Sequence, residues 1–123
     1  MFWSRRRKGP DAQRSTDRPL SRRARWEIQE RINVLNRRLG SLRAEIDEIN
    51  RRRDEKEQRV RRAKDEVKRL KAKRRPKRRD IKGAKETLRR RNRDLKKTKS
   101  VLKQTKCEKK SLTKKRDRLS LRV

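Results

Sequence analysis

The sequence predicts an all-α protein: one long, kinked helix that forms a coiled coil, with a disordered basic tail and no globular core. The first reason is composition, because only 26% of the 123 residues are hydrophobic and 2% aromatic, while 53% are charged. Such a chain has too little apolar surface for an ordinary core. The second reason is spacing, because the apolar residues recur every three or four positions, as in helices that pair through a narrow stripe.

The predicted tail covers residues 1–20. It begins with Phe2 and Trp3 and contains Pro10 and Pro19, which oppose a continuous helix. Ser21 follows as a candidate N-cap, since a serine hydroxyl can accept a hydrogen bond from the first turn of a helix.

The predicted coiled coil covers residues 21–75. With Ile32 at a and Leu35 at d of a heptad repeat, seven successive a and d positions are apolar, before Arg53 and Lys56 interrupt the pattern. Ile or Val at a with Leu at d favours a parallel homodimer. The predicted oligomer seam consists of Ile28, Ile32, Leu35, Leu39, Leu42, Ile46, Ile49, Val60, Val67 and Leu70.

Residues 76–83 predict a kink or hinge, because Pro76 removes a helical hydrogen bond and Gly83 weakens a helix. Apolar residues from Ile81 to Leu102 nevertheless return to the a positions without a change of phase. The preserved phase favours a chain that continues in one direction, with a helical hairpin as the alternative. A basic helix is predicted over residues 84–121.

Positive charge dominates the chain, with 48 Lys and Arg against 17 Asp and Glu and a net charge of +31. Residues 24–58 are close to neutral at +1, whereas residues 59–123 carry +24. This layout indicates an association segment followed by a segment that binds a polyanion, with nucleic acid as the first expected partner. The residues expected to contact phosphates or an import receptor are Lys73, Arg74, Arg75, Lys77, Arg78, Arg79, Arg89, Arg90, Arg91, Arg93, Lys96 and Lys97.

Catalytic and metal-binding chemistry is not expected. The chain has no histidine and Cys107 is its one cysteine, so it offers neither a histidine base nor a Cys/His zinc cluster. We therefore expect no enzyme and no cofactor. Two rival functions stay open: a structural protein of a ribosome-like ribonucleoprotein, and a binder of anionic membrane surfaces, which the narrow apolar stripe disfavours.

Four features in order resemble small basic coiled-coil accessory proteins of viruses, such as the fourth nonstructural protein of orbiviruses and the delta antigen of hepatitis delta-like agents. They are an Arg-rich start at residues 5–8, Trp26 before the heptads, the coil over 28–70 and basic runs near 71–79 and 88–118. The resemblance implies a nonstructural protein that binds nucleic acid in the nucleus or nucleolus and cytoplasm of a host cell. The cluster over residues 73–79 also allows an import receptor as a partner.

Overall fold

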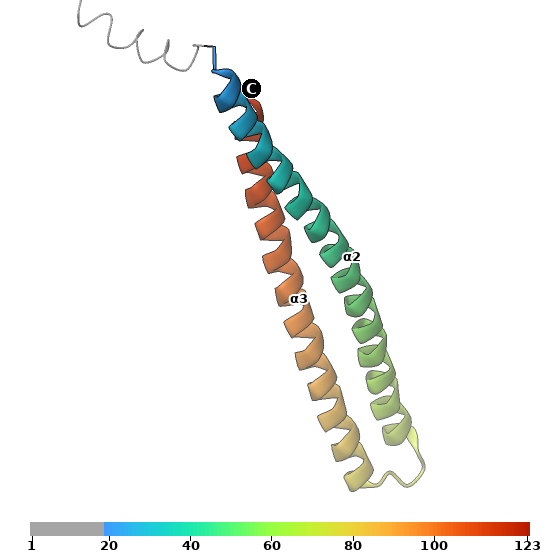
Figure 1. The fold of residues 1–123 in the computed structure, drawn as a ribbon. Helices are drawn as coiled ribbons and strands as arrows, with labels where there is room; N and C mark the ends of the chain where they lie inside the picture. Colours follow the sequence, from blue (N-terminus) through green and yellow to red (C-terminus); the bar gives the residue numbers. More distant parts are fainter. Residues whose placement is uncertain (1–18) are drawn as a thin grey trace, which may run out of the picture.

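Two long helices joined by a short loop make up residues 19–123, the part of the chain that the computed structural model describes (Figure 1). Helix α2 spans Arg22–Ala72 and helix α3 spans Arg78–Ser120. The all-α fold class is confirmed, and residues 19–123 contain no strand. Residues 1–18, which hold most of the predicted tail, lie outside the described residues.

Helix α2 begins at the predicted cap. Ser21 has an extended backbone, and its hydroxyl accepts a hydrogen bond from the backbone N–H of Ala24 at 3.0 Å. This bond satisfies one of the amide donors that a helix start leaves without a partner. With 51 residues, α2 is about 76 Å long at 1.5 Å per residue.

The chain reverses direction after α2, so the predicted continuation past Pro76 is wrong. Residues 73–77 are non-helical, and α3 then runs back beside α2 in the antiparallel sense (Figure 1). Pro76 lacks a backbone donor and disfavours the helical conformation at Arg75, so α2 has to end before it. The five-residue connection lets the apolar residues of α2 pack against α3 of the same chain at a small loop-closure entropy. A dimer would cost the translational and rotational entropy of a second molecule.

The break between the helices also differs from the predicted hinge over residues 76–83, because only residues 76 and 77 of that range are non-helical. Because α3 begins at Arg78, Gly83 lies inside a regular helix, where its carbonyl accepts a hydrogen bond from Thr87 Oγ1 at 3.1 Å. A Cβ atom added at Gly83 would meet no atom within 4 Å, and the same holds for Gly40 in α2. Neither glycine is required by the backbone here, since no described glycine has a positive φ.

The buried residues follow the predicted seam. Leu42 is completely enclosed, while Leu35, Ile46 and Ile49 are half-buried. The seam packs against α3 of the same chain, so the predicted parallel homodimer stays a prediction. The buried residues are Ile28, Ile32, Leu39, Leu42, Val60, Ala63, Val67 and Leu70 in α2, and Thr98 and Leu102 in α3.

Candidate nucleic-acid interface

Two ion pairs between the helices define the two sides of the hairpin. Arg38 Nη2 lies 2.9 Å from Glu108 Oε1, and Lys99 Nζ lies 3.9 Å from Glu57 Oε1. Arg38 and Glu108 occupy g positions of the heptad, whereas Glu57 and Lys99 occupy e positions, so the two pairs flank the seam on opposite sides. We call these the Glu108 side and the Lys99 side. The hydrogen bond from Arg38 to Glu108, reinforced by charge attraction, raises the pKa of the Arg38 guanidinium.

Polar residues fill the middle of the seam. Lys56 Nζ donates to Asp94 Oδ1 at 3.0 Å and to Thr98 Oγ1 at 2.6 Å, and the Thr98 hydroxyl donates to the backbone carbonyl of Asp94 at 3.2 Å. Arg53, one layer away, keeps a buried Nε atom that has no hydrogen-bond partner. The two residues that interrupt the sequence pattern therefore place charge inside the contact between the helices.

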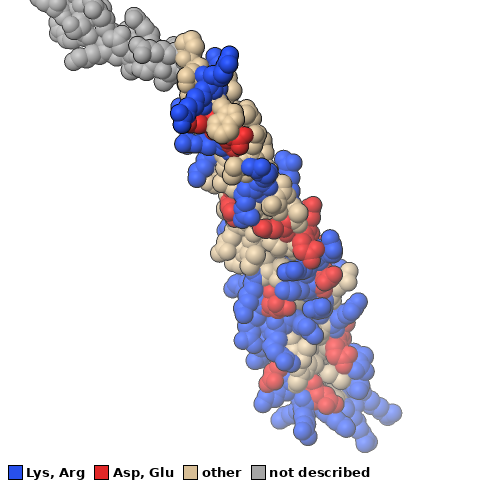
Figure 2. Space-filling view, viewed as in Figure 1, with Lys and Arg blue, Asp and Glu red and all other residues tan. Residues whose placement is uncertain are grey.

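Positive charge is concentrated at the loop end of the hairpin. Because α3 runs back along α2, the chain reversal gathers residues 59–93 there, with nineteen Lys and Arg and four Asp and Glu, a net charge of +15 over 35 residues. The rest of the hairpin, residues 22–58 and 94–123, carries only +12 over 67 residues. Figure 2 shows Lys and Arg side chains covering the loop end.

All twelve residues predicted to contact phosphates or an import receptor are exposed. None of them forms an ion pair with a carboxylate among residues 19–123. The structure divides them into two groups, which lie at the tip and along α3. The tip group is Lys73, Arg74, Arg75, Lys77, Arg78 and Arg79, and the α3 group is Arg89, Arg90, Arg91, Arg93, Lys96 and Lys97.

The α3 group does not share one face of its helix. Arg89 and Lys96 occupy b positions next to the Lys99 side, whereas Arg90, Arg93 and Lys97 occupy c and f positions away from it. The sequence reasoning missed the other members of that first line, although their spacing of three and four residues was a readable signal. The full line, which we call the α3 ladder, is Lys82, Lys85, Arg89, Lys96, Lys99, Lys103, Lys106 and Lys110.

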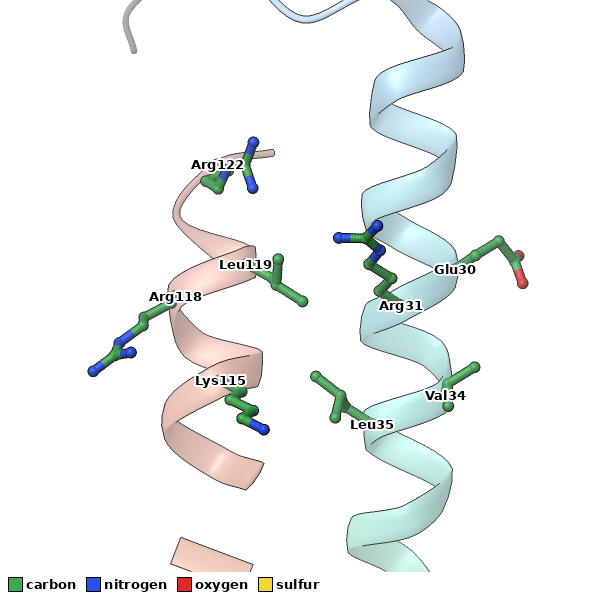
Figure 3. A pocket seen from close by; sticks show the side chains of 8 residues that line it. All are labelled: Glu30, Arg31, Val34, Leu35, Lys115, Arg118, Leu119 and Arg122. Carbon is green, nitrogen blue, oxygen red and sulfur yellow. The ribbon is translucent and has the colours of Figure 1, made fainter. Parts of the chain in front are cut away.

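A hollow of about 600 Å³ lies at the open end of the hairpin, on the Glu108 side. Leu35 and Leu119 face each other across it, and Arg31 and Lys115 reach into the same gap (Figure 3). The helices pack less closely here than at Leu42, which explains why Leu35 is only half-buried.

Other chemistry is sparse in the described part of the chain. Cys107 is a free, exposed thiol on α3. Residues 19–123 bring together no group of three or more His, Cys, Asp or Glu side chains that could hold a metal ion. Neither α2 nor α3 combines the length and the apolar character that a membrane-spanning helix needs.

Comparisons of the chain with known protein families, with curated proteins and with solved structures found no match. The resemblance to viral coiled-coil proteins therefore stays a prediction.

Proposed function

We propose that the protein binds nucleic acid through phosphate contacts, largely without sequence preference, with the loop end of the hairpin as the centre of the site. The observation that carries the proposal is the +15 charge of residues 59–93, which the chain reversal gathers at one end of the molecule. Lys and Arg that neutralise phosphates release counterions from the nucleic acid, and this release supplies most of the affinity in non-specific binding.

The exposure of the tip supports phosphate contacts over base reading. All of residues 71–80 are exposed, and the six cations of the tip group have no carboxylate partner among residues 19–123. They are therefore free to pair with an external anion. Among residues 19–123, Trp26 is the only large aromatic side chain, and it lies near the open end, 64% exposed. The loop end therefore has no aromatic side chain on which a base could stack.

The test is a titration of the full chain against several RNA and DNA sequences at a series of salt concentrations. For about 6–10 neutralised phosphates, affinity should fall by roughly three to five orders of magnitude between 50 and 200 mM salt. Affinities for different sequences should agree within about tenfold. A shallow salt dependence, or one sequence preferred by more than about a hundredfold, would contradict the proposal.

A pair of matched variants locates the site. The first replaces the tip group (Lys73, Arg74, Arg75, Lys77, Arg78 and Arg79) with Gln, and the control replaces six exposed, unpaired cations near the open end (Arg22, Arg25, Arg37, Lys114, Lys115 and Arg118). Both variants lose the same charge. The tip variant should lose much more affinity, whereas equal losses would show that net charge alone matters and that the loop end is not the centre.

The same tip favours nuclear import as a second function. A cluster of exposed Lys and Arg outside a helix is a candidate for recognition by an import receptor, and residues 73–77 are non-helical, with extended backbone at Lys73 and Lys77. Fusion of the full chain to a fluorescent protein should give nuclear accumulation, which the tip variant should lose. Nuclear accumulation that persists in the tip variant would assign import to another basic segment.

Anionic membranes are the main rival ligand for a cationic tip. The loop end carries no exposed apolar residue that could enter the headgroup region, because residues 71–80 are basic except Ala72, Pro76 and Asp80. We therefore expect vesicles with anionic lipids to bind only at low salt and more weakly than RNA. A nonstructural viral role or a place in a ribonucleoprotein would both use the proposed nucleic-acid binding.

A further inference from the structure

We propose that nucleic acid lies along one side of the hairpin, the Lys99 side, and that the α3 ladder is the contact surface that extends the site from the loop end. This inference rests on the proposed nucleic-acid binding and assigns it a face, a direction and a length. It differs from a tip-only site, because most ladder residues lie on the shaft of the rod.

The two sides of α3 differ in charge. On the Lys99 side, the e and b positions from residue 78 to residue 113 hold Lys and Arg throughout, except for Asn92 and Thr113, and no acidic residue. On the Glu108 side, the g positions include Asp80, Asp94 and Glu108. A polyanion that approaches the Glu108 side meets these carboxylates, whereas those e and b positions of α3 on the Lys99 side carry none.

Helix α2 widens this face near the loop. Its e and b positions on the Lys99 side hold Arg61, Lys64, Lys68 and Lys71, all exposed, opposite the first members of the ladder. Because packed helix axes lie about 8–10 Å apart, the two rows form a cationic surface two helices wide. Nearer the open end α2 contributes Asp47, Asp54 and Glu57 instead, so there the ladder on α3 alone carries the contact.

Two shallow hollows lie along the α3 ladder on the Lys99 side. One is lined by Arg78, Lys82, Lys85 and Arg89 with Glu86 at its edge, and a second by Lys99, Lys103, Lys106 and Lys110 beside Leu102 and Cys107. These shallow hollows follow one another along α3, and the cations of the α3 ladder border both of them.

The length of the ladder sets the size of the site. Lys82 to Lys110 spans about 42 Å at 1.5 Å per residue, which corresponds to about 12 base pairs at 3.4 Å each. A site confined to the tip would need about half that length or less, and so the two arrangements predict different dependences on duplex length.

The first experiment compares two six-residue variants of α3 in the full chain, both with the tip intact. The ladder variant replaces Lys82, Lys85, Lys96, Lys103, Lys106 and Lys110 with Gln, and the matched control replaces Arg90, Arg93, Lys97, Lys114, Lys115 and Arg118. Gln keeps a high helix propensity, and circular dichroism should show unchanged helix content in both. The slope of log affinity against log salt should fall by about five in the ladder variant and by at most about two in the control.

The second experiment measures the affinity of the wild-type chain for duplexes of 6, 12 and 24 base pairs at one salt concentration. Affinity should rise steeply from 6 to 12 base pairs. From 12 to 24 base pairs it should rise only in proportion to the number of overlapping sites that the longer duplex offers. Equal slopes in the two variants, or equal affinity for 6 and 12 base pairs, would overturn the one-sided face while leaving nucleic-acid binding intact. A wild-type chain that binds no duplex and no single strand would overturn the proposed function itself.

Discussion

Lys56 and Asp94 join the two helices across the middle of the seam, with Lys56 Nζ 3.0 Å from Asp94 Oδ1. The lysine side chain is 22% exposed and the aspartate 45%, so the pair is only partly screened by water. Because a lysine inside a seam needs a partner at one height of the facing helix, this pair favours the observed antiparallel register over a shifted one.

The pair can be tested by a double-mutant cycle. Asp94→Ala should lower the free energy of unfolding by about 1–2 kcal/mol, because it leaves the ammonium of Lys56 with only the Thr98 hydroxyl. Lys56→Met should cost less, since an apolar residue suits the seam. Urea denaturation of both single variants and of the double variant should give a coupling energy of about 1 kcal/mol. Asp65→Ala removes an exposed carboxylate from α2 and serves as the control, which should change stability little. A coupling energy of zero would show that the pair does not help to fix the register of the two helices.

Truncations along the seam should differ with their local packing. Leu42→Ala should cost about 2–5 kcal/mol, because Leu42 is fully enclosed and its removal leaves a cavity. Leu35→Ala should cost only about 1 kcal/mol, since Leu35 borders the hollow at the open end and is already half in contact with water. Thermal or urea unfolding measures both, with the exposed Val34→Ala as control. Equal costs at the two leucines would mean that the open end closes in solution.

Alanine at either glycine should stabilise the protein. Gly40 and Gly83 lie inside helices with open space around the added Cβ, so Gly40→Ala and Gly83→Ala should each raise the free energy of unfolding by about 0.5–1 kcal/mol. Gly83→Ala also distinguishes a regular helix from the predicted hinge, because at a hinge the substitution would be neutral or destabilising. The melting temperature, followed by circular dichroism, gives the answer.

The chain reversal has a direct distance test. Cys107 is the native thiol on α3, and Ala44→Cys adds an exposed thiol on α2 close to the same height. Two nitroxide labels there should be roughly 20–30 Å apart, because helix axes pack about 8–10 Å apart and both labels point outward. A continuous helix would separate them by about 95 Å.

The wild-type chain labelled at Cys107 alone is the control for that distance. A monomeric hairpin gives no short distance between single labels, whereas a parallel dimer brings two copies of Cys107 together. Sedimentation equilibrium on the same samples should report the mass of one chain at micromolar concentration, because the seam is already buried within the molecule. Twice that mass would support the parallel homodimer that the sequence favours.

The sequence predicted α2 well and the direction of the chain badly. Ser21 as the cap and the run from Ile28 to Leu70 as a buried stripe could be read directly, because capping and heptad spacing are local properties. The phase of the repeat past Pro76 carried no information on direction, since a parallel dimer and an antiparallel hairpin both place the same residues in the seam.

The polar middle of the seam was beyond local reasoning. The spacing of the α3 ladder could have been read from the sequence, but the side of the hairpin on which it lies could not. Thr98 is buried and Thr105 is half-buried, positions where the sequence shows no hydrophobic residue to signal a contact. Taken alone, α3 carries cations around most of its circumference, and the position of α2 decides which of them share a side of the hairpin. The pairing of Lys99 with Glu57 and of Arg38 with Glu108 identifies the two sides.

The short connection between α2 and α3 has a kinetic consequence. Contacts next to a five-residue loop form at low entropic cost, so folding should begin at the tip and proceed toward the open end. The tip is also where like charges meet most densely, and their repulsion has to be overcome in the first step. Added salt should therefore speed folding while it weakens the proposed binding, and stopped-flow refolding across salt would reveal that opposition. A polyanion bound at the tip would reduce the repulsion between its cations, as salt does, and so speed the first folding step. It would then remain bound to the folded hairpin, so that binding and folding would assist each other.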